Sequence, residues 1–178
     1  MAERKIAKAG PEAEFKLTRE FNAPRELVWK AWTDPKHLAH WWGPKGMTVT
    51  VHKVDLRPGG VFHYSITMSD GFTFWGKFVY HEIAPPEKLV FVTSFSDENQ
   101  GITTHPMAPD WPQETLSTVL FTERNGKTTL SMVGVPVNAT PHQIQTFING
   151  FKSMEGGWGG TMDKLETYFE QTRKEGSR

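Results

Sequence analysis

Residues 140–169 read TPHQIQTFINGFKSMEGGWGGTMDKLETYF, and this stretch decides the fold. Its apolar side chains recur at steps of three and four residues, which is the spacing of a helix that buries one face. These side chains are Ile144, Phe147, Ile148, Phe151, Met154, Trp158, Met162, Leu165 and Phe169. Thr140-Pro141-His142-Gln143 has the form of a capping box with proline in the first helical turn. The stretch therefore predicts one long C-terminal helix.

Four glycines surround Trp158 in the middle of this predicted helix. Each glycine inside a helix lowers its stability by about 1 kcal/mol relative to alanine. The apolar spacing nevertheless continues through Gly156, Gly157, Gly159 and Gly160 without a slip. We interpret the glycines as positions where another segment approaches the helix backbone closely, or where space is left for a bound molecule.

The composition excludes several classes of protein. Lysine plus arginine and aspartate plus glutamate both total 20, so no net charge favours nucleic acid, an anionic membrane or an acidic partner. The absence of cysteine excludes disulfides, thiol nucleophiles and cysteine-ligated zinc. Neither a signal-peptide pattern nor an apolar run of about 20 residues is present, so we expect a cytoplasmic protein without membrane insertion.

The chain length and local patterns predict a single domain. We assign it to residues 15–172, between a flexible N-terminal tail, 1–14, and a C-terminal tail, 173–178. Two short helices are expected after the first strand: one begins near Pro24 and ends at Asp34, and the other runs from Pro35 to about Trp42.

Before the long helix, apolar and polar residues alternate in a series of short segments typical of strands. The segments are residues 15–21, 47–51, 61–68, 72–83, 89–95, 115–122 and 128–137. Asp70-Gly71 and Asn125-Gly126 are hairpin dipeptides, so successive strands are expected to pair antiparallel. A sheet of about seven strands must twist and curl. The sequence therefore predicts an α+β fold in which a curved antiparallel sheet surrounds the C-terminal helix and leaves space where side chains are small.

One connection, residues 96–113, is longer than the loops of most compact domains. It contains His105 beside Pro106, and it also contains Trp111 and the acidic residues Asp97 and Glu98. Its three prolines and its tryptophan favour an ordered lid over a floppy loop.

Several short motifs add a specific resemblance. They are Phe21-Asn22-Ala23-Pro24, Val28-Trp29, Ala31-Trp32-Thr33-Asp34-Pro35, Trp41-Trp42-Gly43-Pro44, Asp55-Leu56-Arg57-Pro58-Gly59-Gly60, Pro85-Pro86-Glu87-Lys88-Leu89-Val90 and Gly157-Trp158. With the order of elements, they resemble the helix-grip fold of the START-like, or SRPBCC, superfamily. Within it they are similar to the branch named after the C-terminal domain of the activator of the ninety-kilodalton heat-shock chaperone's ATPase. Phe95-Ser96-Asp97-Glu98 and the His105-Pro106 loop resemble a bacterial subgroup of that branch without an assigned reaction.

The resemblance implies an apolar cavity between the sheet and the long helix. It does not imply one chemistry, because members include lipid carriers, hormone receptors, polyketide cyclases, ring-hydroxylase subunits and co-chaperone domains. The ligand-binding residues that it implies here are Phe62, Tyr64, Ile66, Met68, Phe91, Thr93, Phe95, His105, Trp111, Phe147, Phe151, Met154 and Trp158. The alternative is that these side chains are ordinary core. Tyr64 and Trp158 are the stronger candidates, because buried tyrosine and tryptophan carry polar groups that need partners.

Catalytic chemistry has only weak candidates. His105 could act as a general base or anchor a ligand if a nearby carboxylate positions it, and Tyr64 could transfer a proton. The alternative for His105 is a histidine that fixes its own loop through a hydrogen bond. His37 and His40 lie three residues apart and could share a metal on a helix, but no third ligand is recognisable. Neither a metal nor a cofactor is therefore expected.

Three functions stay open at this point. The first, and the expected one, is a carrier or sensor that binds a small apolar or amphipathic molecule in the cavity. The second is an enzyme of the polyketide cyclase or dehydratase type acting on a hydrophobic substrate. The third is an interaction module that regulates a chaperone, although this chain lacks the separate N-terminal domain of the eukaryotic activators. No nucleic-acid partner is expected, and a homodimer formed through sheet edges or exposed tryptophans stays open.

Overall fold

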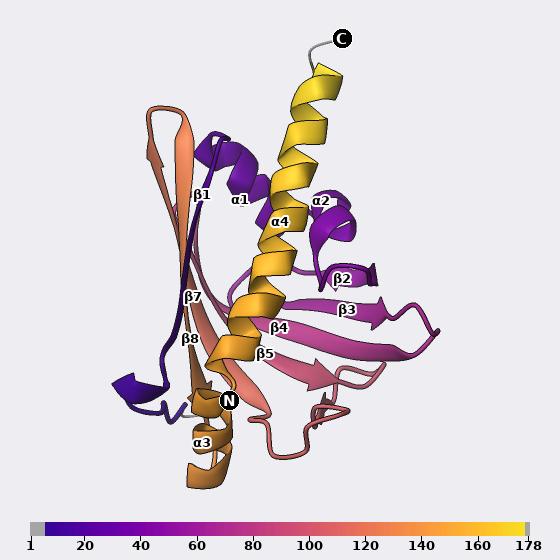
Figure 1. Ribbon diagram of the computed structural model, residues 1–178, viewed down its shortest axis with the longest axis vertical. Coiled ribbons are helices and arrows are strands. Elements are labelled where there is room, and N and C mark those ends of the chain that lie inside the picture. Colours follow the sequence, from indigo (N-terminus) through magenta and orange to yellow (C-terminus); the bar gives the residue numbers. More distant parts are fainter. Residues whose placement is uncertain (1–5, 177–178) are drawn as a thin grey trace.

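The computed structural model describes residues 6–176, which form one sheet, a set of short helices and one long helix (Figure 1). In chain order the elements are η1 (Pro11–Ala13), β1 (Phe15–Phe21), α1 (Arg25–Thr33), α2 (Pro35–Trp41), β2 (Thr48–Val54), β3 (Val61–Thr67), β4 (Thr73–Ala84), β5 (Lys88–Ser96), β6 (Ile102–Thr103), β7 (Glu114–Arg124), β8 (Lys127–Val137), α3 (Pro141–Asn149) and α4 (Phe151–Gly176). Among these residues no helix combines the length and apolar character needed to cross a membrane.

The sheet is an antiparallel meander closed at one side by the first strand. Its order is β1-β8-β7-β5-β4-β3-β2, and the short β6 pairs with β5. The sheet curves behind α4, which crosses it along most of its height, and α1 and α2 lie beside the upper half of this helix (Figure 1). The predicted α+β architecture of a curved sheet around a long C-terminal helix is confirmed.

The predicted single C-terminal helix is in fact two helices, which is a correction. The capping box forms as expected: Gln143 N–H donates to Thr140 Oγ1 at 3.1 Å, and Thr140 N–H donates to Gln143 Oε1 at 2.9 Å. The first helix, α3, ends at Asn149, and α4 begins at Phe151. The residue between them is Gly150, and a Cβ atom there would lie 2.7 Å from the ring of Trp111. The two helices therefore meet at the glycine against which the Trp111 indole packs.

The glycines around Trp158 have a different role from Gly150. The α4 helix is continuous through all four of them. A Cβ atom on Gly156, Gly157 or Gly159 would meet no atom within 4 Å. Close approach of another segment therefore does not explain these residues, and that interpretation was wrong for them. Close approaches occur at glycines outside α4, and Gly150 and Gly76 are the two that line the cavity next to an aromatic side chain.

The two predicted tails are more ordered than expected within the described residues. Ala9 N–H donates to the Pro136 carbonyl at 3.0 Å, and Asn138 N–H donates to the Ala7 carbonyl at 2.9 Å. Ala13 is fully buried, because the η1 turn packs beside α3. Backbone hydrogen bonds thus join the segment 6–14 to the sheet, although its polar composition gave no sign of them. Residues 1–5 lie outside the described range. At the other end, α4 continues to Gly176 through most of the expected C-terminal tail.

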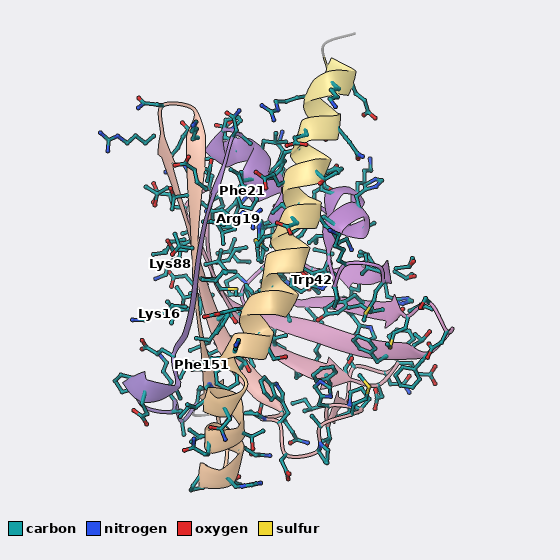
Figure 2. The ribbon with its side chains drawn as sticks, in the orientation of Figure 1. Lys16, Arg19, Phe21, Trp42, Lys88 and Phe151 are labelled. Carbon is teal, nitrogen blue, oxygen red and sulfur yellow. The ribbon has the colours of Figure 1, made fainter. Side chains whose placement is uncertain are left out.

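Polar contacts attach the long helix to the first strand and to the loop after α2. Arg19 on β1 donates to Asp163 at 2.7 Å and to Glu166 at 2.6 Å, and Figure 2 labels Arg19 beside α4. The guanidinium holds the pKa of the Asp163 carboxyl below its usual range. On the opposite side, Thr161 Oγ1 donates to the Gly43 carbonyl at 3.2 Å, which connects α4 to the loop after α2. These polar contacts hold α4 between β1 and the loop after α2.

Candidate ligand cavity

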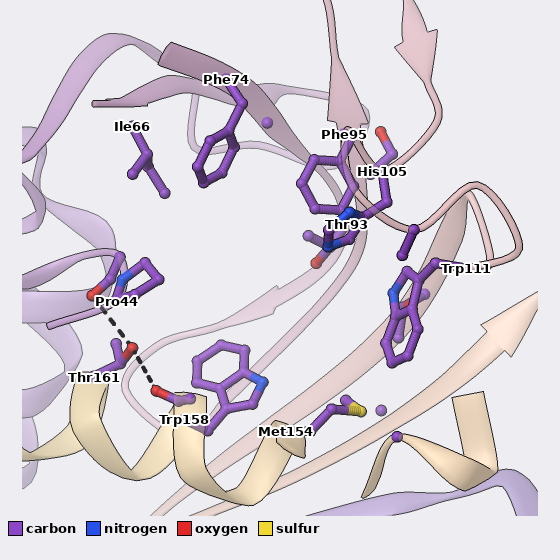
Figure 3. Close-up of a pocket in the computed structure, with 18 of the residues that line it drawn as sticks. Pro44, Ile66, Phe74, Thr93, Phe95, His105, Trp111, Met154, Trp158 and Thr161 are labelled. Atoms are coloured by element: carbon purple, nitrogen blue, oxygen red, sulfur yellow. Dashed lines mark hydrogen bonds between the residues drawn. The ribbon is translucent and has the colours of Figure 1, made fainter. Parts of the chain in front are cut away.

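A cavity of about 560 Å³ lies between the sheet, the loop after β6 and the two C-terminal helices. Figure 3 shows Met154 and Trp158 rising from α4 toward Phe74 and Phe95 of the sheet. The loop contributes His105 and Trp111 at one side of this space (Figure 3). The cavity occupies the place that the resemblance implies, between sheet and helix.

The cavity exists because side chains on the inner face of the strands change size along each strand. At one end this face carries large buried rings: Phe78 and Phe91 stack with their centroids 4.0 Å apart. Two residues further along the same strands the inward residues are Gly76 and Thr93, both of which line the cavity. The strands β7 and β8 continue the pattern, since Ser117 pairs directly with Gly134. Small side chains at adjacent positions of the paired strands leave a cavity, and α4 covers it.

Most of the residues predicted for the wall come together in the cavity. They are Tyr64, Ile66, Met68, Thr93, Phe95, His105, Trp111, Phe147, Met154 and Trp158.

Three predicted wall residues lie elsewhere. Phe62 and Phe91 are buried in the packed aromatic end of the sheet, where both contact Phe78. Phe151 packs between Phe15, at 5.8 Å, and Phe147, at 5.6 Å between ring centroids. Phe62 and Phe91 lie two residues before Tyr64 and Thr93 on the same strands, at positions where the packed core replaces the cavity.

Several wall residues were not predicted. They are Trp42, Phe74, Gly76, Met107, Thr115, Ser117, Met132 and Gly134. The small residues Thr115, Ser117 and Gly134 had a sequence signal, because they sit at inward positions of strands that otherwise carry large apolar residues. Trp42 had none: it follows the short helix α2, and only the folded chain brings its ring to 5.7 Å from that of Trp158.

Aromatic contacts hold the loop over the cavity. The His105 ring lies 4.6 Å from the ring of Phe95, and the Trp111 ring lies 5.3 Å from that of Phe147. Trp111 also occupies the bend at Gly150. The loop therefore joins the sheet to the helix break. Met107, at its tip, is 69% exposed.

The structure supports the loop-fixing alternative for His105. Met107 N–H donates to His105 Nδ1 at 3.0 Å, so in the neutral ring the proton sits on Nε2. Burial lowers the pKa of His105, which keeps the ring neutral at pH 7. The nearby acids are engaged elsewhere: Asp97 accepts from its own turn at Asn99 and Gly101, both at 2.8 Å. Asp110 lies 3.5 Å from His142. The predicted carboxylate that would orient His105 as a base is not in place.

The other predicted histidines also have structural partners. His37 contacts the hydroxyl of Tyr168 through Nδ1, and His40 stacks on the same ring at 5.3 Å. Between residues 6 and 176, no three histidine, cysteine, aspartate or glutamate side chains gather closely enough to hold a metal ion. The two histidines therefore fix α2 against α4 through Tyr168.

The wall of the cavity has no formal charge. No aspartate, glutamate, lysine or arginine lines it among the described residues. Its polar side chains are neutral: the hydroxyls of Tyr64, Thr93, Ser94, Thr115, Ser117, Ser153 and Thr161, the amide of Gln113 and the neutral His105 ring. Burial raises the pKa of Tyr64 to about 12, so its hydroxyl keeps its proton. Chemically, the site offers apolar surface and neutral hydrogen-bonding groups.

Comparison with known proteins gives the fold and the family. Protein Ms6760 from Mycobacterium smegmatis is similar at 27% identity, with 93% of this chain and 95% of that chain covered and a TM-score of 0.72. A protein from Arthrobacter aurescens has 23% identity, coverage of 94% and 91%, and a TM-score of 0.76. Protein NE0264 from Nitrosomonas europaea has 23% identity, coverage of 93% and 99%, and a TM-score of 0.73. Among curated proteins, none matches this chain.

A family match comes from the sequence itself. It carries the description "Activator of Hsp90 ATPase homolog 1-like protein" and spans residues 22–170, from just after β1 to near the end of α4. The match includes the motifs after β1, the hairpins and the glycine-rich helix on which the resemblance rested. This chain therefore belongs to the family of Activator of Hsp90 ATPase homolog 1-like proteins, within the START-like superfamily.

Proposed function

We propose that this protein binds a small hydrophobic or amphipathic molecule in the cavity, as a cytoplasmic carrier or sensor. One observation carries the proposal: a cavity of about 560 Å³ between the sheet and the C-terminal helices, with a largely apolar wall. Specific small-molecule sites fall in the range of roughly 300–1,000 Å³ and are mostly apolar with a few placed polar groups. The wall described above has that composition.

The arrangement of the wall favours an amphipathic ligand. Met154 and Trp158 cover the cavity from the helix side, and Phe74 and Phe95 bound it on the sheet side (Figure 3). Most of the hydroxyl groups lie on the strands at the floor, and Ser153 and Thr161 add two from α4. A ligand with an apolar body and one polar group would place the body between the rings. Removing its apolar surface from water contributes roughly 25 cal/mol per Å².

A catalytic function has less support from the same residues. His105 uses Nδ1 to hold its own loop, and no carboxylate of the described chain orients it. Tyr64 is a weak acid, because burial raises the pKa of its hydroxyl. General acid–base catalysis works best with a group whose pKa lies near the operating pH. Binding is thus the function that these groups serve without rearrangement.

The test uses two variants of neighbouring residues on one strand. Ser117 lines the cavity floor, whereas Thr118 lies on the opposite face of β7. Ser117→Leu fills part of the cavity, and Thr118→Leu is its matched control. The neutral fluorophore prodan serves as the probe. A ligand that binds the folded state raises the melting temperature in proportion to RT ln(1 + [L]/Kd).

We expect prodan to bind the wild-type chain and Thr118→Leu alike, with higher fluorescence and a higher melting temperature. Ser117→Leu should weaken binding by about tenfold, equivalent to about 1.4 kcal/mol. Equal binding by both variants would place the probe outside the cavity. Native mass spectrometry of the purified chain checks separately for a co-purified molecule, and its mass would identify the ligand directly.

A further inference from the structure

We infer that the cavity selects uncharged ligands that carry a carbonyl-type oxygen, and that this oxygen accepts a hydrogen bond from the hydroxyl of Tyr64. The inference rests on the proposed function, and it names the ligand class that the function leaves open. The first step concerns charge. Because no acidic or basic side chain of the described residues lines the cavity, an ionic ligand would lose its hydration without gaining a counter-charge.

The second step concerns the seat of the Tyr64 hydroxyl. Tyr64 is only 6% exposed, yet it belongs to the cavity wall. Its ring lies over Gly76 on the paired strand, and a Cβ atom at Gly76 would lie 2.6 Å from both Cζ and the hydroxyl oxygen of Tyr64. Any other residue at this position would displace the hydroxyl. Glycine at this position therefore leaves the space that the Tyr64 hydroxyl occupies.

The third step concerns hydrogen-bond partners. Buried hydroxyls are nearly always hydrogen-bonded. The Tyr64 proton has no acceptor among residues 6–176, so it is available to a molecule in the cavity. The hydroxyl stays protonated, since burial raises its pKa to about 12. This donor belongs to the cavity wall and has no acceptor within the described chain, so it marks a position where a ligand acceptor would gain a hydrogen bond.

The fourth step concerns direction, and Trp42 decides it. The Trp42 indole N–H is also buried without an acceptor of good geometry in the described chain, and the two rings lie 5.7 Å apart. An indole N–H can only donate, and this one opposes the rise in the pKa of Tyr64 that burial causes. The ring next to Tyr64 therefore offers a second donor and no acceptor. A ligand acceptor suits this pair of donors, whereas a ligand donor would find no partner in either.

The experiment compares three naphthalenes that share one apolar body. Acetylnaphthalene carries a carbonyl, ethylnaphthalene has no acceptor, and naphthoate is an anion at neutral pH. Affinities are measured for the wild-type chain and for Tyr64→Phe, which removes only the hydroxyl. The control is Tyr80→Phe: the Tyr80 hydroxyl is buried without a partner, and Tyr80 does not line the cavity. The informative quantity is the ratio of the affinities for acetylnaphthalene and ethylnaphthalene, because the ratio cancels differences in hydrophobicity.

We expect Tyr64→Phe to lower this ratio by about tenfold, the effect of one hydrogen bond, and to leave ethylnaphthalene binding unchanged. Tyr80→Phe should leave the ratio at its wild-type value. In the infrared spectrum, the carbonyl stretch of bound acetylnaphthalene should move to higher frequency in Tyr64→Phe, since the hydrogen bond to it is lost. Naphthoate should bind weakest.

The outcomes separate this inference from the proposed function. A ratio that does not change in Tyr64→Phe, with both neutral probes still bound, overturns the carbonyl assignment and leaves the binding function intact. Naphthoate binding as tightly as acetylnaphthalene overturns the selection against charge. Failure of both neutral probes to bind the wild-type chain overturns the proposed function, and the inference falls with it.

Discussion

The inner face of the sheet has two ends that share the same strands and differ in the size of their side chains. At one end Phe62, Phe78 and Phe91 are fully buried and in ring contact. At the other end the same strands present Gly76 and Thr93, and a cavity opens. The backbone pairing is continuous across both ends. The comparison teaches that side-chain volume at a few inward positions, rather than backbone topology, decides where this fold is solid and where it is hollow.

The largest expected effect is a loss of unfolding free energy when a ring is removed from the packed end. Phe78→Ala removes a ring that stacks on Phe91 and touches Trp42, with centroids 4.0 and 5.1 Å away. Truncating a buried phenylalanine costs about 3–5 kcal/mol of unfolding free energy. Phe95→Ala, at the open end, should cost about 1–2 kcal/mol, because its ring already borders empty space. Urea unfolding measures both. Equal losses would contradict the distinction between a solid and a hollow end.

A smaller effect is expected at the border between the two ends. Gly76→Ala places a methyl group against the Tyr64 hydroxyl and should lower the unfolding free energy by about 1–3 kcal/mol. Gly134→Ala is the control, since its Cβ would lie 3.5 Å from Thr115, an ordinary contact. We expect its effect to stay within about 0.5 kcal/mol. If the two alanines were equally tolerated, the seat of Tyr64 would not depend on glycine.

The glycines of α4 provide a test on the opposite wall. Gly157 lines the cavity, whereas a Cβ at Gly160 would face Lys45 at 3.5 Å. Gly157→Leu should weaken prodan binding by about tenfold, an effect of about 1.4 kcal/mol. Gly160→Leu should leave the affinity unchanged, and circular dichroism should show both variants folded. This expectation replaces the view that all four glycines act alike. Loss of binding in Gly160→Leu would restore it.

The smallest effect concerns pH and the loop. Burial lowers the pKa of His105, so folding favours its neutral form. The stabilisation from a group with a lowered pKa is complete above its ordinary value and is lost as the pH falls through about 6.5 toward the lowered one. Protonation also makes Nδ1 a donor, which ends the hydrogen bond from Met107 N–H. Prodan affinity should therefore decrease at acid pH.

His105→Asn should flatten this pH dependence, since an amide oxygen can accept from Met107 N–H without titrating. His81→Asn, an exposed position on β4, serves as the control. Fluorescence titrations at several pH values measure the difference. An unaltered pH profile in His105→Asn would show that another group controls the loop.

Much of the fold could be predicted because its signals are local. The alternation that runs from Phe15 to Phe21 and the hairpin at Asn125-Gly126 both appear in the structure as expected. The helix break at Gly150 could not be predicted from its own segment. The indole of Trp111 packs against this glycine, and Trp111 lies on a loop far away in sequence. The periodic spacing on both sides of the break is preserved, so the sequence pattern alone does not reveal it.

The candidate site divides in the same way. The sequence by itself determined the chemistry of the wall: a chain with aromatic strands, a His105 loop and no excess charge provides an apolar, neutral cavity. It also determined the pairing of the strands that tight turns join, such as β7 with β8, whereas the pairing of β1 with β8 is a contact of the folded chain. Tertiary structure alone decided where the cavity begins, why Phe62 and Phe91 are core, and that Trp42 meets Tyr64 above Gly76. The physical reason is that packing depends on which side chains share a volume, and that volume is set by residues distant in the chain.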